Sequence, residues 1–160
     1  MTDADKNKIY LAIIAVLLFI IATMAYKFII AGATVPAEDG RLAIILEPGE
    51  RALMLREMRD FVSGLQRIAD ALSREDMQDV AKASRALGSG RAHDVPASLM
   101  GKLPLEFKTL ARSVHGEFDA IAMDAEAIGM PKRTLEQLSG ALQKCAACHA
   151  SYQVKSAELK

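Results

Sequence analysis

The chain of 160 residues has no tryptophan, few aromatic residues and only two cysteines. Aromatic side chains make up 5% of it. Alanine, leucine and methionine supply most of the apolar content, and all three favour helices. Few segments show the alternation of β-branched residues that is typical of a sheet, so we expect an all-α protein. Lysine plus arginine and aspartate plus glutamate number 20 each, and this balance gives no indication of nucleic acid as a partner.

One long apolar segment, Ile9 to Ile30, contains a single charge, Lys27. About twenty apolar residues are enough to span the hydrocarbon core of a bilayer, and Tyr10 and Tyr26 suit the two headgroup zones. The alternative is a cleaved signal peptide with the small residues 31–33 as its cleavage site. We favour an uncleaved transmembrane anchor over 9–30 with a cytoplasmic leader at 1–8, because the apolar segment is longer than a signal core and lacks a strongly basic leader.

The remaining chain divides into a linker and one helical domain. Residues 31–47 are expected to be a linker, since proline and glycine interrupt them and Ala43 to Leu46 is too short for a convincing element. Residues 48–160 are expected to form an antiparallel four-helix bundle. Its first helix starts at Pro48, a residue suited to a first turn, and ends near Leu72. One face of this helix carries apolar residues at spacings of three and four: Met54, Met58, Phe61, Leu65, Ile68 and Leu72.

Capping signals and glycines divide the rest of this domain. Ser73-x-x-Asp76 resembles a capping box for a second helix, which ends at Gly88. A third helix is expected to begin near Ser98 or Pro104 and to end at Gly129. The fourth begins at Pro131. Its inward-facing residues are expected to be Leu135, Leu138, Leu142, Cys145, His149 and Tyr152.

Both cysteines belong to one motif, Cys145-Ala146-Ala147-Cys148-His149. The pattern C-x-x-C-H is the attachment signature of c-type haem. Two thiols at this spacing can add to the two vinyl groups of one porphyrin, and the histidine can then bind its iron. We therefore expect one covalently attached haem c with His149 as the proximal iron ligand. Because haem c is attached outside the cytoplasm, the domain is expected in the periplasm, on the bacterial inner membrane.

Three other interpretations of the motif are weaker. A thioredoxin-like Cys-x-x-Cys usually accompanies a βαβ pattern, which this chain lacks. A zinc site could recruit His93 or His115, but neither has the paired spacing of known zinc motifs. The last alternative is a chance match with no cofactor.

The segment CAACHASY, on the last of four expected helices, resembles the class II c-type cytochromes, the cytochrome c-prime family. Tyr152 matches the aromatic position of the family motif, whereas Gln153 replaces its usual basic residue. The resemblance implies a haem inside a helical bundle and homodimers formed through the first two helices. It also implies one of two arrangements on the distal side of the haem, opposite the histidine ligand. In one, an apolar residue of the first helix covers an open iron that binds NO or CO. In the other, a methionine of that helix is the second iron ligand.

The first expected helix offers both kinds of distal residue. We favour Met58 as the distal ligand, because it is one turn further into the bundle than Met54, and Leu55 matches the apolar position by spacing. Phe61 and Tyr152 are expected to complete the haem pocket with Met54 and Leu55. Weaker candidates are His115 and His93 as ligands, and Arg51, Arg56 and Arg59 as partners of the haem propionates.

These features predict an electron carrier and not an enzyme. We expect one-electron transfer between the haem and other redox proteins or membrane oxidoreductase subunits. The alternatives are a five-coordinate haem protein that binds NO or CO, and an assembly subunit whose haem is mainly structural.

Overall fold

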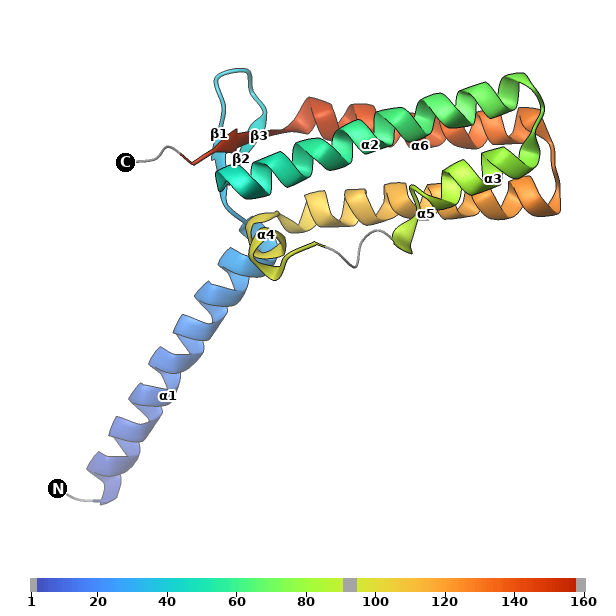
Figure 1. The fold of residues 1–160 in the computed structure, drawn as a ribbon. Helices are drawn as coiled ribbons and strands as arrows, with labels where there is room; N and C mark the ends of the chain where they lie inside the picture. The colour runs from blue at the N-terminus through green and yellow to red at the C-terminus, as the bar shows by residue number, and fades with distance from the viewer. Residues whose placement is uncertain (1–2, 91–94, 158–160) are drawn as a thin grey trace.

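The computed structural model describes residues 3–90 and 95–157, which form a mainly helical protein with one small sheet. A long N-terminal helix extends away from a bundle of helices, and the sheet lies where the two meet (Figure 1). The elements in chain order are α1 (Asp3–Ala25), the π-helical turn η1 (Tyr26–Ala31), β1 (Thr34–Pro36), β2 (Leu42–Leu46), α2 (Pro48–Ser73), α3 (Met77–Arg85), α4 (Ala97–Lys102), α5 (Leu105–Ala127), α6 (Pro131–Ser151) and β3 (Tyr152–Ser156).

The N-terminal helix is long and apolar enough to cross a membrane. The segment Asp5–Ala31 has 27 residues, and none of its most apolar stretch is buried against the rest of the protein. A signal sequence would have the same properties. This part of the structure therefore agrees with the length and composition of the expected anchor.

The helix boundaries follow local sequence signals. Pro48 opens α2, and the backbone N–H of Glu47 donates to the Glu50 carboxylate at 3.0 Å in a capping box. The capping box expected for Ser73 is wrong, because Ser73 is the last residue of α2. Asp76 caps α3 instead and accepts a hydrogen bond of 3.0 Å from the backbone N–H of Asp79.

Of the two starts expected for the third helix, Pro104 is confirmed, and the segment around Ser98 forms a separate short helix. α4 ends at Lys102 and α5 begins at Leu105. Pro104 lies between them, and a proline disfavours helical backbone in the residue before it. Leu103 accordingly has extended backbone angles, φ −80° and ψ 132°.

A three-stranded sheet contradicts the purely all-α expectation and the expected linker at 31–47. β2 lies between the other two strands, antiparallel to β1 and parallel to β3. Ala43, Ile44 and Leu46 of β2 are 0% exposed. A short continuous apolar run of this kind is typical of a fully buried strand. Tyr152, which was expected on the last helix, is the first residue of β3.

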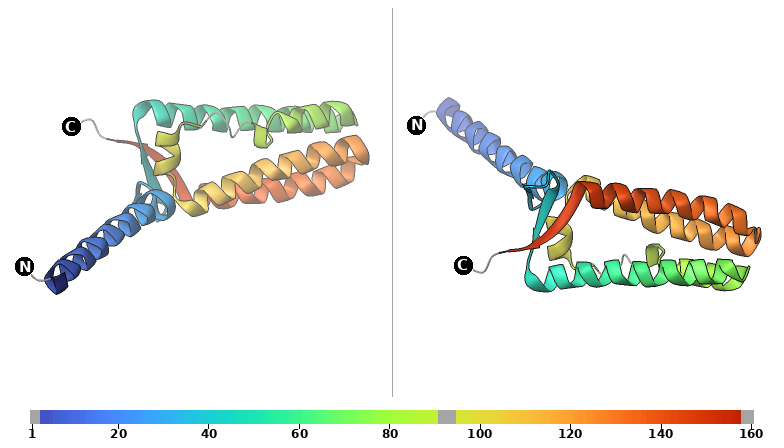
Figure 2. Two further views of the ribbon diagram at one scale, coloured as in Figure 1. Left: turned by 90° about the horizontal axis from the view of Figure 1, so that it is seen from below. Right: turned by 90° about the horizontal axis from the view of Figure 1, so that it is seen from above.

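The helices lie in two layers that the sheet connects. α2 packs on α3, α3 on α5, and α5 on α6, whereas α2 and α6 make very little contact. Figure 2 shows α2 and α3 on one side, α5 and α6 on the other, and β2 and β3 passing from one side to the other. α3 has only nine residues, against 26 in α2. All four helices of the expected bundle are therefore present together only at the end away from the sheet, where the short α3 lies.

The buried side chains form two separate clusters. The helical core fills the end of the helices away from the sheet, and the sheet core lies between the sheet, α4 and the start of α5. The helical core comprises Ile68, Ala71, Leu72, Val80, Ala81, Ala83, Leu87, Val114, Phe118, Ile121, Ala125, Leu138 and Ala141. The sheet core comprises Ile44, Leu46, Leu99, Leu103 and Phe107.

Gly32 joins the N-terminal helix to the domain through a very close backbone contact. Its φ is +66°, and a Cβ there would lie 2.5 Å from the Lys102 carbonyl oxygen. Gly40 has φ +83° with nothing within 4 Å of a Cβ. Gly40→Ala should therefore cost only left-handed strain, about 1–2 kcal/mol. Gly32→Ala should lower the free energy of unfolding by about 1–3 kcal/mol more, because a fixed backbone must also move.

Urea unfolding of both variants in detergent micelles measures this difference. Equal losses of unfolding free energy at the two glycines would contradict the close contact at Gly32.

Candidate cofactor-attachment site

The C-x-x-C-H motif occupies the last turns of α6, directly before β3. Cys145 and Cys148 are half-buried free thiols. Cys145 packs against the helical core, and Cys148 packs against the sheet core. The two thiols therefore lie at the boundary between the two clusters.

The environment of both thiols keeps them protonated. Burial raises the pKa of Cys145, and burial together with the neighbouring Cys145 raises the pKa of Cys148. Redox-active and metal-binding cysteines show the opposite shift. Among the described residues no three histidine, cysteine or acidic side chains are placed to hold a metal ion. Within residues 3–90 and 95–157 the pair thus lacks the neighbours of a zinc site, and burial raises the pKa of both thiols where a thioredoxin-like motif lowers it.

The buried face of α6 differs by about one residue from the face expected from the sequence. Thr134, Leu138 and Ala141 are buried, whereas Leu135 and Leu142 are 54% and 44% exposed. Leu138 is buried as expected, but Thr134 and Ala141 are buried in place of their larger neighbours Leu135 and Leu142. The face continues through Cys145 and Cys148 to Tyr152.

His149 is exposed, so its expected position on the inward face is wrong. His149 lies on the same exposed surface of α6 as Leu135 and Leu142. The Arg41 guanidinium donates a hydrogen bond of 3.3 Å to the His149 carbonyl oxygen. The backbone of the motif is therefore tied to the β1–β2 turn, while the histidine side chain is exposed.

The expected distal residues of α2 all lie in its loosely packed half. Within α2 the buried residues are Ile68, Ala71 and Leu72, so the helix has none before Ile68. Of the residues before it, Met54 and Leu55 are half-buried, and so are Met58 and Phe61.

The two methionines differ in what they contact. Met54 packs against the sheet core, and Phe61 packs against the helical core. Met58 lies between them along the helix and belongs to neither cluster. It is therefore the less tightly packed of the two methionines.

Tyr152 connects the motif to α5. Its hydroxyl donates to the Glu106 carboxylate at 3.3 Å, and its ring meets the Phe107 ring edge-on with centroids 5.4 Å apart. Burial and Glu106 raise the pKa of Tyr152. Tyr152 packs against the sheet core, as Cys148 does. The structure thus places this expected pocket residue next to one of the thiols.

The other candidates have varied surroundings. The His115 Nδ1 lies 2.7 Å from the Leu87 carbonyl oxygen, and the ring is 5.2 Å from Phe61. Since a carbonyl only accepts, Nδ1 carries the proton of this bond, which leaves Nε2 as the atom that could bind a metal. Arg51 donates to the Val154 carbonyl oxygen at 3.4 Å.

The remaining candidates are at the periphery. Arg56 and Arg59 are exposed. His93 lies outside the residues that the structure describes.

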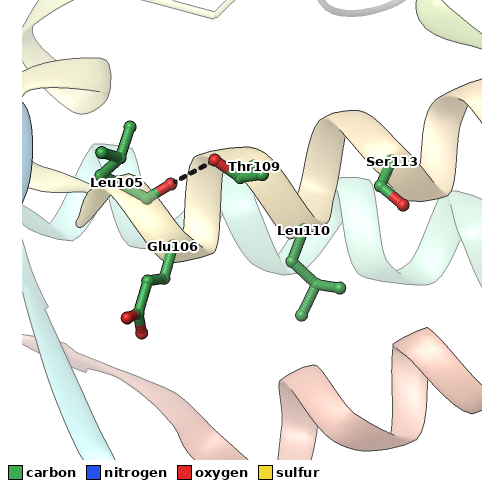
Figure 3. Close-up of a pocket in the computed structure, with 5 residues that line it drawn as sticks. All are labelled: Leu105, Glu106, Thr109, Leu110 and Ser113. Carbon is green, nitrogen blue, oxygen red and sulfur yellow. Dashed lines mark hydrogen bonds between the residues drawn. The ribbon is translucent and has the colours of Figure 1, made fainter.

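Sequence reasoning missed the contribution of α5 and of the β1–β2 turn. α5 lines a cavity of about 450 Å³ that is open to solvent (Figure 3). Glu106 and Leu110 point from α5 toward the ribbons of β3 and α6 in this view. The acidic residue beside Phe107 and the Asp39–Arg41 pair of the turn were the only sequence signals for these contacts. The residues that line the cavity are Leu105, Glu106, Thr109, Leu110 and Ser113.

Comparisons with protein-family models, with curated proteins and with solved structures find no match to this chain.

The register of α6 can be tested with two leucines of the same helix. Leu138→Ala removes a buried side chain and should lower the free energy of unfolding by about 2–5 kcal/mol. Leu135→Ala removes an exposed one and should change it by less than about 0.5 kcal/mol. Thermal or urea unfolding measures both, and a loss for Leu135→Ala as large as that for Leu138→Ala would support the register expected from the sequence, which buries both leucines.

Proposed function

We propose that this protein is a membrane-anchored c-type cytochrome that carries out one-electron transfer on the periplasmic side of a bacterial inner membrane. Asp5–Ala31 is the anchor, and α2, α3, α5 and α6 form the four-helix haem domain, as in the cytochrome c-prime family. Other redox proteins or membrane oxidoreductase subunits exchange electrons with it. The chain acts as a free carrier or as a fixed subunit of such a complex.

The main support is the position of the two motif thiols between two separate apolar clusters. Cys145 borders the helical core and Cys148 borders the sheet core. Half-buried apolar residues of α2, from Met54 to Phe61, lie along the same stretch between the clusters. Apolar side chains that stay half-exposed inside a helical domain suit a large apolar group attached to the thiols.

The strand pair β2–β3 supports the same arrangement. α6 leads into Tyr152 at the start of β3, and α2 follows Leu46 at the end of β2. Since β2 and β3 are parallel and in register over five residues, these two points are about 13 Å apart along the strands, four steps of about 3.3 Å. Helices in direct contact are about 8–10 Å apart. The strands therefore hold α2 and α6 farther apart than direct packing requires.

The residues of the site have distinct roles in this proposal. The Cys145 and Cys148 thiols form the two thioethers, and the His149 imidazole binds the iron through Nε2. Met58 is the second ligand, because Met54 is already packed in the sheet core. When bound, the haem supplies an iron that changes between the ferrous and ferric states. A thioether ligand stabilises the reduced state and raises the potential.

A second candidate function is the binding of NO or CO at an open iron. Leu55 is half-buried on the same stretch of α2 as Met58, and it would cover the distal side if Met58 only packs. The two functions differ in whether the chain supplies a second ligand.

Replacement of both cysteines tests the cofactor. The purified wild-type protein should carry one haem that survives denaturation, whereas Cys145→Ala/Cys148→Ala should carry none, because thioethers are the only covalent links. Haem staining of denaturing gels and intact mass measure the attachment. A wild-type chain with two free thiols and no bound haem would overturn the proposed function.

Replacement of each methionine tests the ligand. Met58→Ala should convert a low-spin reduced spectrum to a high-spin one that binds CO, and the potential should fall because the thioether is lost. Met54→Ala is the matched control and should leave the spectrum low-spin. Visible spectra in both redox states, with and without CO, distinguish the cases. A wild-type protein that is high-spin and takes up CO would support gas binding instead of electron transfer.

A further inference from the structure

The apolar N-terminal helix passes into the domain without a flexible linker. The candidate span ends at Ala31. Two residues later, the backbone N–H of Ala33 donates to the Lys102 carbonyl oxygen at 2.7 Å, and the Ala33 carbonyl accepts from Ile45 of β2 at 2.8 Å. Gly32, between them, has no room for a side chain.

The last turn of this helix also contacts α4 and α5 directly. The Lys108 ammonium group donates to the carbonyl oxygens of Phe28 at 3.4 Å and Ile29 at 3.3 Å. A cation suits the carbonyl end of a helix. The Phe28 ring lies beside Gly101 of α4, where an added Cβ would be 3.7 Å away. The corner between α4 and α5 is therefore at the same level as the last turn of the helix.

The length of the helix places that turn near lipid headgroups. A span of 27 residues that rises about 1.5 Å per residue is about 40 Å long. The hydrocarbon core is about 30 Å thick, and the headgroups bring the bilayer to about 40–45 Å. Ala31 then lies in the headgroup layer. The α4–α5 corner, attached beside it, cannot stand far above this layer.

The side chains of the corner suit that position. Leu105 is a large apolar residue that is 43% exposed at the start of α5. Lys27 and Lys108 place positive charge nearby, as is favourable beside lipid phosphates. The third lysine, Lys102, is bound to Glu50 at 2.6 Å, and the carboxylate of Glu106 accepts from Tyr152. The local charge is thus mixed, and the apolar Leu105 is the exposed feature.

We propose that the α4–α5 corner, residues 102–108, rests on the lipid surface with Leu105 in the headgroup layer. This proposal depends on the anchor of the proposed function, but it does not depend on the haem. Since the C-x-x-C-H end of α6 and the sheet lie at this same end of the bundle (Figure 1), the motif is held close to the membrane. The far ends of the helices point away from it.

Single tryptophans can test this position, because the chain contains none of its own. Three variants of the full chain are placed in phosphatidylcholine vesicles that carry no bromine, bromine on the upper part of the acyl chains, or bromine near the chain ends. Leu105→Trp probes the corner. Met123→Trp, 63% exposed on the far half of the same helix, is the matched control, and Phe19→Trp, 71% exposed, probes the anchor. The ratio of tryptophan emission in brominated and unbrominated vesicles removes the effect of quenching by groups within the protein.

Because an interfacial side chain lies about 5–10 Å into the boundary between headgroups and acyl chains, bromine on the upper part of the acyl chains should lower Leu105→Trp emission about twofold. Phe19→Trp lies about 18 Å deeper than Ala31, twelve residues at about 1.5 Å each, and should be quenched by bromine near the chain ends. Met123→Trp should be unchanged by bromine at either position. Quenching of Phe19→Trp without Leu105→Trp would overturn the proposal and leave the anchor intact. Absence of quenching at Phe19→Trp would overturn both the anchor and the position of the corner. Equal quenching of Leu105→Trp and Met123→Trp would overturn the proposed orientation.

Discussion

The parallel pairing of β2 with β3 is the constraint on which the arrangement of this domain depends. It joins the segment before α2 to the segment after α6, although more than a hundred residues separate the two strands in sequence. α2 and α6 make very little contact themselves, so their spacing at this end is set by the strands. The buried side chains of β2, Ile44 and Leu46, also form the sheet core. The β2–β3 pairing thus sets the distance between α2 and α6, and it also builds the apolar core at this end of the domain.

This spacing between α2 and α6 has an energetic cost, because it leaves large apolar side chains half-buried. A large apolar side chain contributes about 1.5–3 kcal/mol when fully buried, so each half-buried one on α2 forgoes about 1 kcal/mol. Leu55, Met58 and Leu110 are all half-buried and belong to neither core. A well-packed domain without a cofactor would bring such residues together. Cys145 borders one core and Cys148 the other, so an apolar group attached to these thiols would lie between the cores and could cover such side chains.

Sequence periodicity predicted the long helices well and the small elements poorly. α2 begins at Pro48 and ends one residue after the expected Leu72, because proline and a regular apolar face are strong local signals. The face of α6 was assigned one residue away, since alanine and threonine can be buried where helices approach closely, and periodicity alone favours leucine. β2 was missed because its apolar run is too short to identify a strand alone, and β3 because pairing between distant segments has no local pattern. His149 was recognised through its motif, but its exposure depends on that rotation of α6.

The same sheet links the site to the N-terminal helix. Ala33 bonds to Ile45 of β2 and to Lys102 of α4, and β2 in turn pairs with β3, which follows the motif directly. Each step is a backbone hydrogen bond or a peptide bond, so little freedom of rotation remains between the helix and the motif. A haem on a flexible tether would meet partners in many orientations. A haem held by this chain of contacts would present one orientation to a partner in the membrane, and electron exchange would then depend on that geometry more than on diffusion.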